Sequence, residues 1–133
     1  MPRLKNIGYT LLAFAILAPA LHAAPPQDFY SAKAAADVDE ASQDATAKAA
    51  MLATQRAFLD AGVKACATDD RTKADLSNFV VVMHLDASGQ ITQTWRHGDS
   101  PLALCVERYA RGKILFVPPR NPFYTSLEIS FVP

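Results

Sequence analysis

The residues with the most distinctive chemistry in this chain are two cysteines, Cys66 and Cys105. A reactive or redox-cycling pair usually has a C-x-x-C spacing, which these two lack. In an exported chain, two cysteines most simply form one structural bridge. Closing a loop of about 40 residues stabilises a domain by roughly 4 kcal/mol in the chain-entropy model. We therefore predict a structural disulfide.

Two histidines and two aspartates form a second candidate site, because a predicted hairpin brings His84 and Asp86 near His97 and Asp99. Their spacing matches no established ligand motif. Asp86 is explained by the turn of the hairpin, and Asp99 by its position beside a helix cap. We therefore expect no metal and no cofactor.

The serines lack the surroundings of a catalytic nucleophile, and the chain has no glycine-rich phosphate loop. None of the following lies in a G-x-S-x-G setting: Ser77, Ser88, Ser100, Ser126 and Ser130. The sequence therefore predicts that the protein is not an enzyme.

Binding hot spots are enriched in aromatic and cationic residues. Such residues lie at the end of the predicted strand over 90–97 and near the start of the predicted strand over 123–132. These candidate partner-binding residues are Trp95, Arg96, His97, Arg120 and Tyr124. A structural alternative is that Trp95 only covers the core under the helices.

An acidic cluster precedes these residues and consists of Asp37, Asp39, Glu40 and Asp44. Such a cluster is usually a solvated helix face, and the alternative is a docking patch for a partner.

The first 23 residues have the features of a secretory signal. Arg3 and Lys5 precede an uncharged apolar run over 7–17, and Ala20 and Ala23 end two possible cleavage sites. The alternative is an uncleaved anchor, because no charge occurs between Lys5 and Asp28. No cysteine follows the run for lipid attachment, so we expect no stable membrane anchor after cleavage. The expected location is the periplasm, with secretion as the alternative.

The overall charge excludes some partners. The chain has 13 basic and 13 acidic residues, and two of the basic ones lie in the predicted signal. The remainder is therefore slightly acidic, and we expect it to bind neither nucleic acid nor an anionic membrane.

Hydrophobic periodicity and turn residues predict an α+β domain. An alanine-rich helix or tether over 24–50, with little to pack against, precedes a domain over 51–133. The predicted elements of that domain are a helix over 51–66, strands over 78–86 and 90–97, a helix over 100–111 and a strand over 123–132. Both helices turn a cysteine inward. Because the last strand must pair with the first to stay antiparallel, we expect sheet order 2-1-3 with the helices packed on one face.

Four short motifs of the chain resemble those of one family. They are the strand ending in Asp86-x-x-Gly89-x-Ile91, the Leu104-Cys105-Val106 helix, Phe116-x-Pro118-Pro119 and the final Glu128-Ile129-Ser130-Phe131. The family is the C-terminal domain of TonB and TolA-type periplasmic proteins, especially its AgmX-type relatives with paired cysteines. The resemblance implies a non-catalytic periplasmic domain that binds another envelope or secreted protein, through an exposed strand edge. The proline-rich spacer of TonB-like transducers is missing, which argues against coupling to a membrane motor. A small exported domain with a disulfide also fits an alternative, an inhibitor or immunity protein against a secreted toxin or hydrolase.

Overall fold

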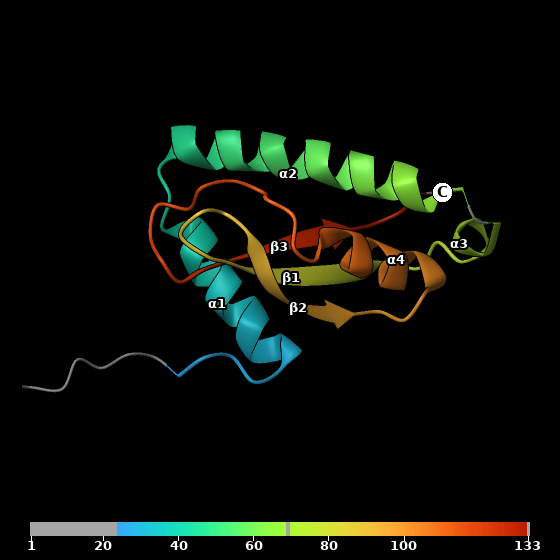
Figure 1. The fold of residues 1–133 in the computed structure, drawn as a ribbon, viewed down its shortest axis with the longest axis horizontal. Helices are drawn as coiled ribbons and strands as arrows, with labels where there is room; N and C mark the ends of the chain where they lie inside the picture. Colours follow the sequence, from blue (N-terminus) through green and yellow to red (C-terminus); the bar gives the residue numbers. More distant parts are fainter. Residues whose placement is uncertain (1–23, 69, 133) are drawn as a thin grey trace, which may run out of the picture.

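A computed structural model describes residues 24–68 and 70–132, so the predicted signal peptide lies outside the described residues. The elements, in chain order, are helices α1 (Phe29–Ala41), α2 (Ala45–Cys66) and α3 (Asp70–Ala74), strands β1 (Phe79–Leu85) and β2 (Ile91–His97), helix α4 (Pro101–Ala110) and strand β3 (Phe123–Ile129) (Figure 1). The segment between the predicted helix over 51–66 and the predicted strand over 78–86 contains the short helix α3, which was not predicted. The last strand ends three residues earlier than predicted.

The three strands form one antiparallel sheet in the order β2-β1-β3, which confirms the predicted topology. β1 is the central strand and has apolar residues on both faces. Val81 and Met83 point to one face and Val82 to the other, and all three are fully buried. A central strand that is apolar on both sides requires cover on both sides of the sheet.

Helices α2 and α4 cover the first face, as predicted. Their apolar residues, including Leu102 and Val106, pack on Phe79, Val81 and Met83 of β1. Ser100 begins α4 by accepting a hydrogen bond from the Ala103 N–H at 3.1 Å, with a proline at the first helical position.

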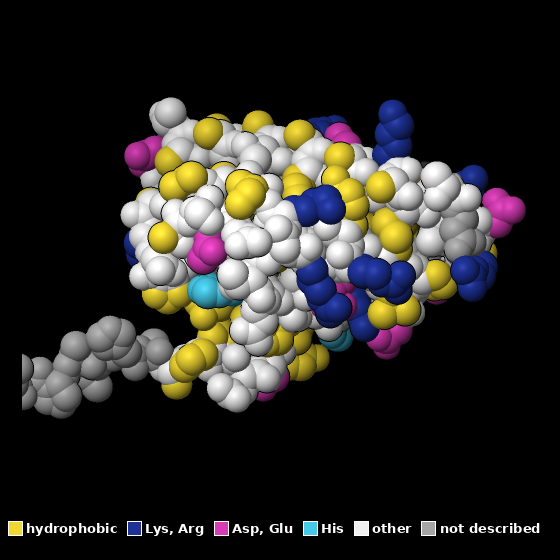
Figure 2. Space-filling model, viewed as in Figure 1, with side chains coloured by type: hydrophobic (Ala, Val, Ile, Leu, Met, Phe, Trp, Pro, Cys, Tyr) yellow, Lys and Arg dark blue, Asp and Glu magenta, His cyan; other side chains and the backbone are white. Residues whose placement is uncertain are grey.

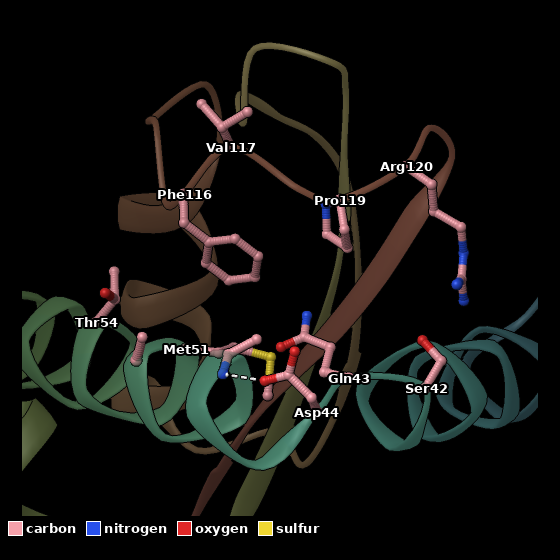
Figure 3. A pocket seen from close by; sticks show the side chains of 11 residues that line it. Ser42, Gln43, Asp44, Met51, Thr54, Phe116, Val117, Pro119 and Arg120 are labelled. Carbon is pink, nitrogen blue, oxygen red and sulfur yellow. Dashed lines mark hydrogen bonds between the residues drawn. The ribbon is translucent and has the colours of Figure 1, made fainter.

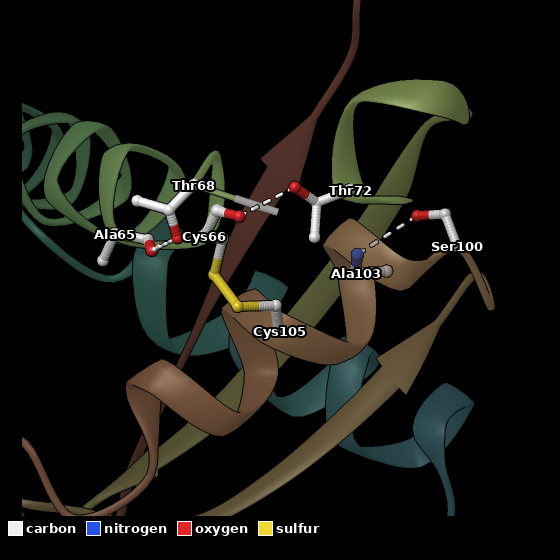
Figure 4. The surroundings of a disulfide bond; sticks show 7 residues. All are labelled: Ala65, Cys66, Thr68, Thr72, Ser100, Ala103 and Cys105. Atoms are coloured by element: carbon white, nitrogen blue, oxygen red, sulfur yellow. Dashed lines mark hydrogen bonds between the residues drawn. A yellow bond between two sulfur atoms is a disulfide. The ribbon is translucent and has the colours of Figure 1, made fainter. Parts of the chain in front are cut away.

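The predicted disulfide is confirmed, and it joins the end of α2 to the middle of α4 (Figure 4). The Cys66 and Cys105 sulfurs are 2.08 Å apart, and their Cα atoms are 5.9 Å apart. The Thr72 hydroxyl of α3 donates to the Cys66 carbonyl at 2.7 Å. The bridge therefore lies where three helices meet.

Helix α1 covers the opposite face, which corrects the expectation that the alanine-rich segment has little to pack against. Ala32 and Ala36 are fully buried on Val82, with Phe29 and Trp95 alongside. Val38, the one sizeable aliphatic residue between 32 and 50, is 67% exposed. The small alanine side chain lets the helix axis approach the sheet closely, and the sheet supplies the larger apolar side chains.

Helix caps separate α1 from α2. Asp28 and Ser31 form a capping box at the start of α1. Asp44 accepts a hydrogen bond from the Ala47 N–H at 2.8 Å and thereby begins α2. The break between the helices lets α1 and α2 lie on opposite faces of the sheet (Figure 1).

The predicted hairpin between β1 and β2 has a tight turn and a bulge. Asp86 accepts hydrogen bonds from the N–H groups of Ser88 and Gln90, and Gly89 has a φ of 86°. A Cβ at Gly89 would lie 2.2 Å from the Phe116 carbonyl oxygen, so glycine is required on two grounds.

The bulge corrects one detail of the predicted β2. Simple alternation along 90–97 would place Ile91 and Trp95 on the same face of this strand. In the structure, Ile91 pairs with Leu85 while Gln93 pairs with His84, so one extra residue of β2 lies between these pairs. Ile91 therefore joins the α4-side core, and Trp95 faces α1.

Candidate functional site

The outer edge of β3 is closed by two carboxylates of α1. Asp39 accepts a hydrogen bond from the Tyr124 N–H at 2.8 Å, and Glu40 accepts one from the Ser126 N–H at the same distance. The Thr125 hydroxyl also donates to Glu40, at 2.7 Å. These carboxylate oxygens occupy the place of the carbonyls that a neighbouring strand would offer, so β3 has no open edge at these residues.

Ion pairs hold α1 at this edge. The Arg120 guanidinium binds Asp39. Lys33 lies 2.8 Å from Glu128 of β3 and also pairs with Asp37. Burial of Lys33 lowers its pKa, but hydrogen bonds to Asp37 and Glu128 outweigh burial, and the pKa is raised overall.

The acidic cluster is therefore not a uniformly solvated helix face. Asp37 and Asp44 are exposed, whereas Asp39 is 8% exposed. A signal in the sequence could have indicated this role, because Ala32, Ala36, Asp39 and Glu40 follow helical spacing along one face.

The outer edge of β2 is different, because only its first part is covered. The segment after α4 runs antiparallel to the start of β2. The Ile91 N–H donates to the Lys113 carbonyl at 2.8 Å, and the Gly112 N–H donates to the Ile91 carbonyl at 3.0 Å. Residues 112–115 of this chain thus already pair with the start of the β2 edge. This cover does not extend along β2 beyond Gly112.

The direction of the remaining β2 backbone groups follows from the ladder. Residues of an antiparallel pair alternate between those that exchange backbone hydrogen bonds and those that do not. Tyr124 and Ser126 of β3 turn their N–H groups away from β1 and toward α1. The backbone N–H and carbonyl groups of their β1 partners, His84 and Val82, must therefore point toward β2.

The partners of His84 and Val82 on β2 are Gln93 and Trp95, so these two residues bond inward. The alternate residues, Thr94 and Arg96, direct their N–H and carbonyl groups outward. Within residues 24–68 and 70–132, no backbone group pairs with them. Beside them lies a hollow of about 490 Å³ lined by 90–94, Arg111 and Gly112.

Charged side chains border this open edge on the α4 face of the sheet. The buried Glu107 carboxylate lies 3.3 Å from both Arg96 and Arg111. The Arg111 Nε donates to the Thr94 hydroxyl at 3.2 Å, and this hydroxyl donates to Glu107 at 3.1 Å. Arg96 also pairs with Asp99 at 2.7 Å, and hydrogen bonds to Asp99 and Glu107 raise the pKa of Arg96 despite its burial.

Basic side chains gather over α4 in the space-filling view (Figure 2). Arg108, Arg111 and Lys113 are all exposed at or near the end of this helix. The exposed surface over the end of α4 is therefore basic, and Arg111 is the residue of this group that lies beside the open edge.

Aromatic side chains border the same edge on the α1 face. The His97 ring lies 5.1 Å from that of Phe29 and 6.1 Å from that of Tyr30. Tyr30 is 71% exposed. Trp95 packs 6.0 Å from Tyr124, and both are partly buried. Trp95 thus contacts the α1-side core, not the core under α2 and α4.

The structure brings together only some of the predicted binding residues. Trp95, His97 and Tyr124 lie on the α1 face of the sheet, whereas Arg96 faces α4 and Arg120 lies at the β3 edge on Asp39. Sequence reasoning missed Arg111 and Tyr30, which flank the open edge. Their positions at helix ends gave no sign of it, because which helix end meets which strand is a tertiary property.

The two histidines that were considered as metal ligands in the sequence, His84 and His97, have other surroundings. His84 Nδ1 lies 2.7 Å from the Thr92 hydroxyl, and the ring packs on Tyr124 at 5.0 Å. Burial lowers the pKa of His84 although Asp86 opposes this, and burial raises the pKa of Tyr124. Among the described residues, no group of three or more His, Cys, Asp or Glu side chains is placed to hold a metal ion.

A separate apolar hollow of about 470 Å³ lies between the start of α2 and the 116–120 segment (Figure 3). The Phe116 ring points into it toward Met51, whereas Val117 points away. Arg120 and Ser42 border its other side. Nothing in its lining defines a reaction.

Comparison with known proteins adds no relative: no family model, curated protein or solved structure matches the chain. No helix within 24–68 and 70–132 is long and apolar enough to cross a membrane. The geometry of the sheet edges is therefore the main guide to function.

Proposed function

We propose that this protein is an exported, non-catalytic binding domain that captures an extended segment of another envelope or secreted protein on the open edge of β2. The open backbone groups of Thr94 and Arg96 carry this proposal. An added strand there would form hydrogen bonds that no described residue supplies, which is the basis of strand addition.

The contrast between the two edges supports the assignment to β2. An unprotected edge strand invites non-specific pairing, and proteins usually cover such edges. This chain covers β3 with Asp39 and Glu40, and covers the start of β2 with 112–115. A short open stretch next to a covered one is the arrangement expected of a selective docking edge.

Location in the periplasm is part of the proposal. It is supported by the signal-like features of 1–23, by the Cys66–Cys105 bridge and by the resemblance to TonB and TolA-type domains.

Site-specific photocrosslinking in the living cell would test the proposal. A photoreactive amino acid at Thr92, beside the open edge, should capture a discrete partner. The same group at Asp37, an exposed residue of the helix that closes the β3 edge at Tyr124 and Ser126, should not capture it. Crosslinks from both positions, or from neither, would contradict an edge-specific role.

Proline at position 94 provides the decisive variant. Thr94→Pro removes an N–H that points outward, so it should abolish the Thr92 crosslink while leaving the β1–β2 ladder in place. Thr94→Val is the matched control, because it removes the hydroxyl but keeps the backbone donor. A crosslink that survives Thr94→Pro in a folded protein would overturn strand addition.

A further inference from the structure

We propose that the segment bound at β2 alternates acidic and apolar side chains, with the acidic ones on the α4 face. This inference rests on the proposed function, since it specifies the partner of that same edge.

The ladder geometry sets where each partner side chain would lie. A residue opposite Thr94 or Arg96 turns its side chain to the α4 face, because directly paired residues share a face. The residues opposite Trp95 and His97 turn theirs to the α1 face. The two faces of the bound strand therefore meet different chemistry.

On the α4 face, Arg111 is an exposed cation beside Thr94, whereas Arg96 is neutralised by both Glu107 and Asp99. Glu107 is shared between Arg96 and Arg111, and the Arg111 side chain remains 61% exposed. A carboxylate opposite Thr94 would lie beside the Arg111 guanidinium, whose planar donors suit it.

On the α1 face, the bound strand would lie along an aromatic border. Phe29 and Trp95 are partly buried, and Tyr30 exposes most of its ring beside His97. An apolar side chain opposite Trp95 or His97 would cover these rings and remove apolar surface from water.

Two synthetic octapeptides with blocked ends would test the charge pattern, one alternating valine with glutamate and the other valine with lysine. Binding would be followed by backbone amide NMR shifts of Thr94 and Arg96. We expect the glutamate peptide to bind about tenfold more tightly. The part of the chain beyond the predicted signal is slightly acidic, so net charge alone would favour the lysine peptide.

Arg111→Ala should reduce this preference to about twofold or less, since it removes the exposed cation beside Thr94. Arg56→Ala is the matched control, because it removes an exposed cation from α2, and it should keep the full preference. Tyr30→Ala should weaken both peptides to a similar degree.

The outcomes separate the two proposals. Equal binding of both peptides at β2, or an unchanged preference in Arg111→Ala, would overturn the charge pattern and leave strand addition intact. No amide shift at β2 with either peptide would overturn the pattern, while the Thr92 crosslink would independently decide the proposed function.

Discussion

At the scale of single residues, the most informative feature is the use of side-chain carboxylates as a substitute for a strand. Asp39 and Glu40 are adjacent in sequence and bind alternate N–H groups of β3. Alternate outward donors of a strand are about 7 Å apart, a span that two neighbouring acidic side chains of one helical turn can match. Polar groups at a buried edge are thereby satisfied without a fourth strand.

The edge-closing role of Asp39 predicts that two aspartate substitutions in α1 lower the free energy of unfolding by different amounts. Asp39→Ala leaves the Tyr124 N–H and the Arg120 guanidinium without their acceptor, so it should lower the free energy of unfolding by about 2 kcal/mol. Asp37→Ala removes only an exposed pair with Lys33 and should cost less than about 0.5 kcal/mol. Urea denaturation would measure both, and equal effects would contradict the edge-closing role of Asp39.

At the scale of elements, α1 shows that a helix can pack through small residues. Its buried face consists largely of Ala32 and Ala36, which bury little area themselves. The apolar area comes mainly from the sheet and from Phe29. A search for large aliphatic residues within the helix therefore underestimates its packing.

The close approach of α1 to the sheet predicts that a larger side chain at a buried alanine of this helix destabilises the protein. Ala36→Leu would force α1 away from Val82 and should destabilise the protein by about 1–3 kcal/mol. Ala34→Leu adds the same side chain at an exposed position and should change stability by less than about 0.5 kcal/mol. Thermal denaturation followed by circular dichroism would compare them; a tolerated Ala36→Leu would show that α1 does not pack tightly.

At the scale of the whole molecule, both faces of a three-stranded sheet are covered, and the disulfide joins two of the covering helices. The bridge links α2 to α4 across a sequence separation of 39 residues. A loop of that length corresponds to roughly 4 kcal/mol in the chain-entropy model, which is a large share of the stability of a small domain. Such a bridge forms and persists in an oxidising compartment.

The proposed export predicts a defined mature form. The full chain expressed in a Gram-negative host should appear in the periplasmic fraction without its first 20 or 23 residues, and with no free thiol. Intact mass with and without reductant should differ by the two hydrogens of one disulfide. A full-length cytoplasmic product with two reactive thiols would contradict the proposed location.

Much of the fold was determined by the sequence itself. The periodicity of β1, the Asp86 to Gly89 turn and the Ser100-Pro101 helix start depend on neighbours in the chain, and these local rules led to the sheet order and to the Cys66–Cys105 pairing.

Only the tertiary structure decided which sheet edge stays open. The Asp39 to Tyr124 hydrogen bond spans 85 positions, and the cover on β2 comes from a segment after α4. The bulge moved Ile91 to the other face by one inserted residue. These features depend on how distant elements meet in space, and periodicity within a single element carries no information about that.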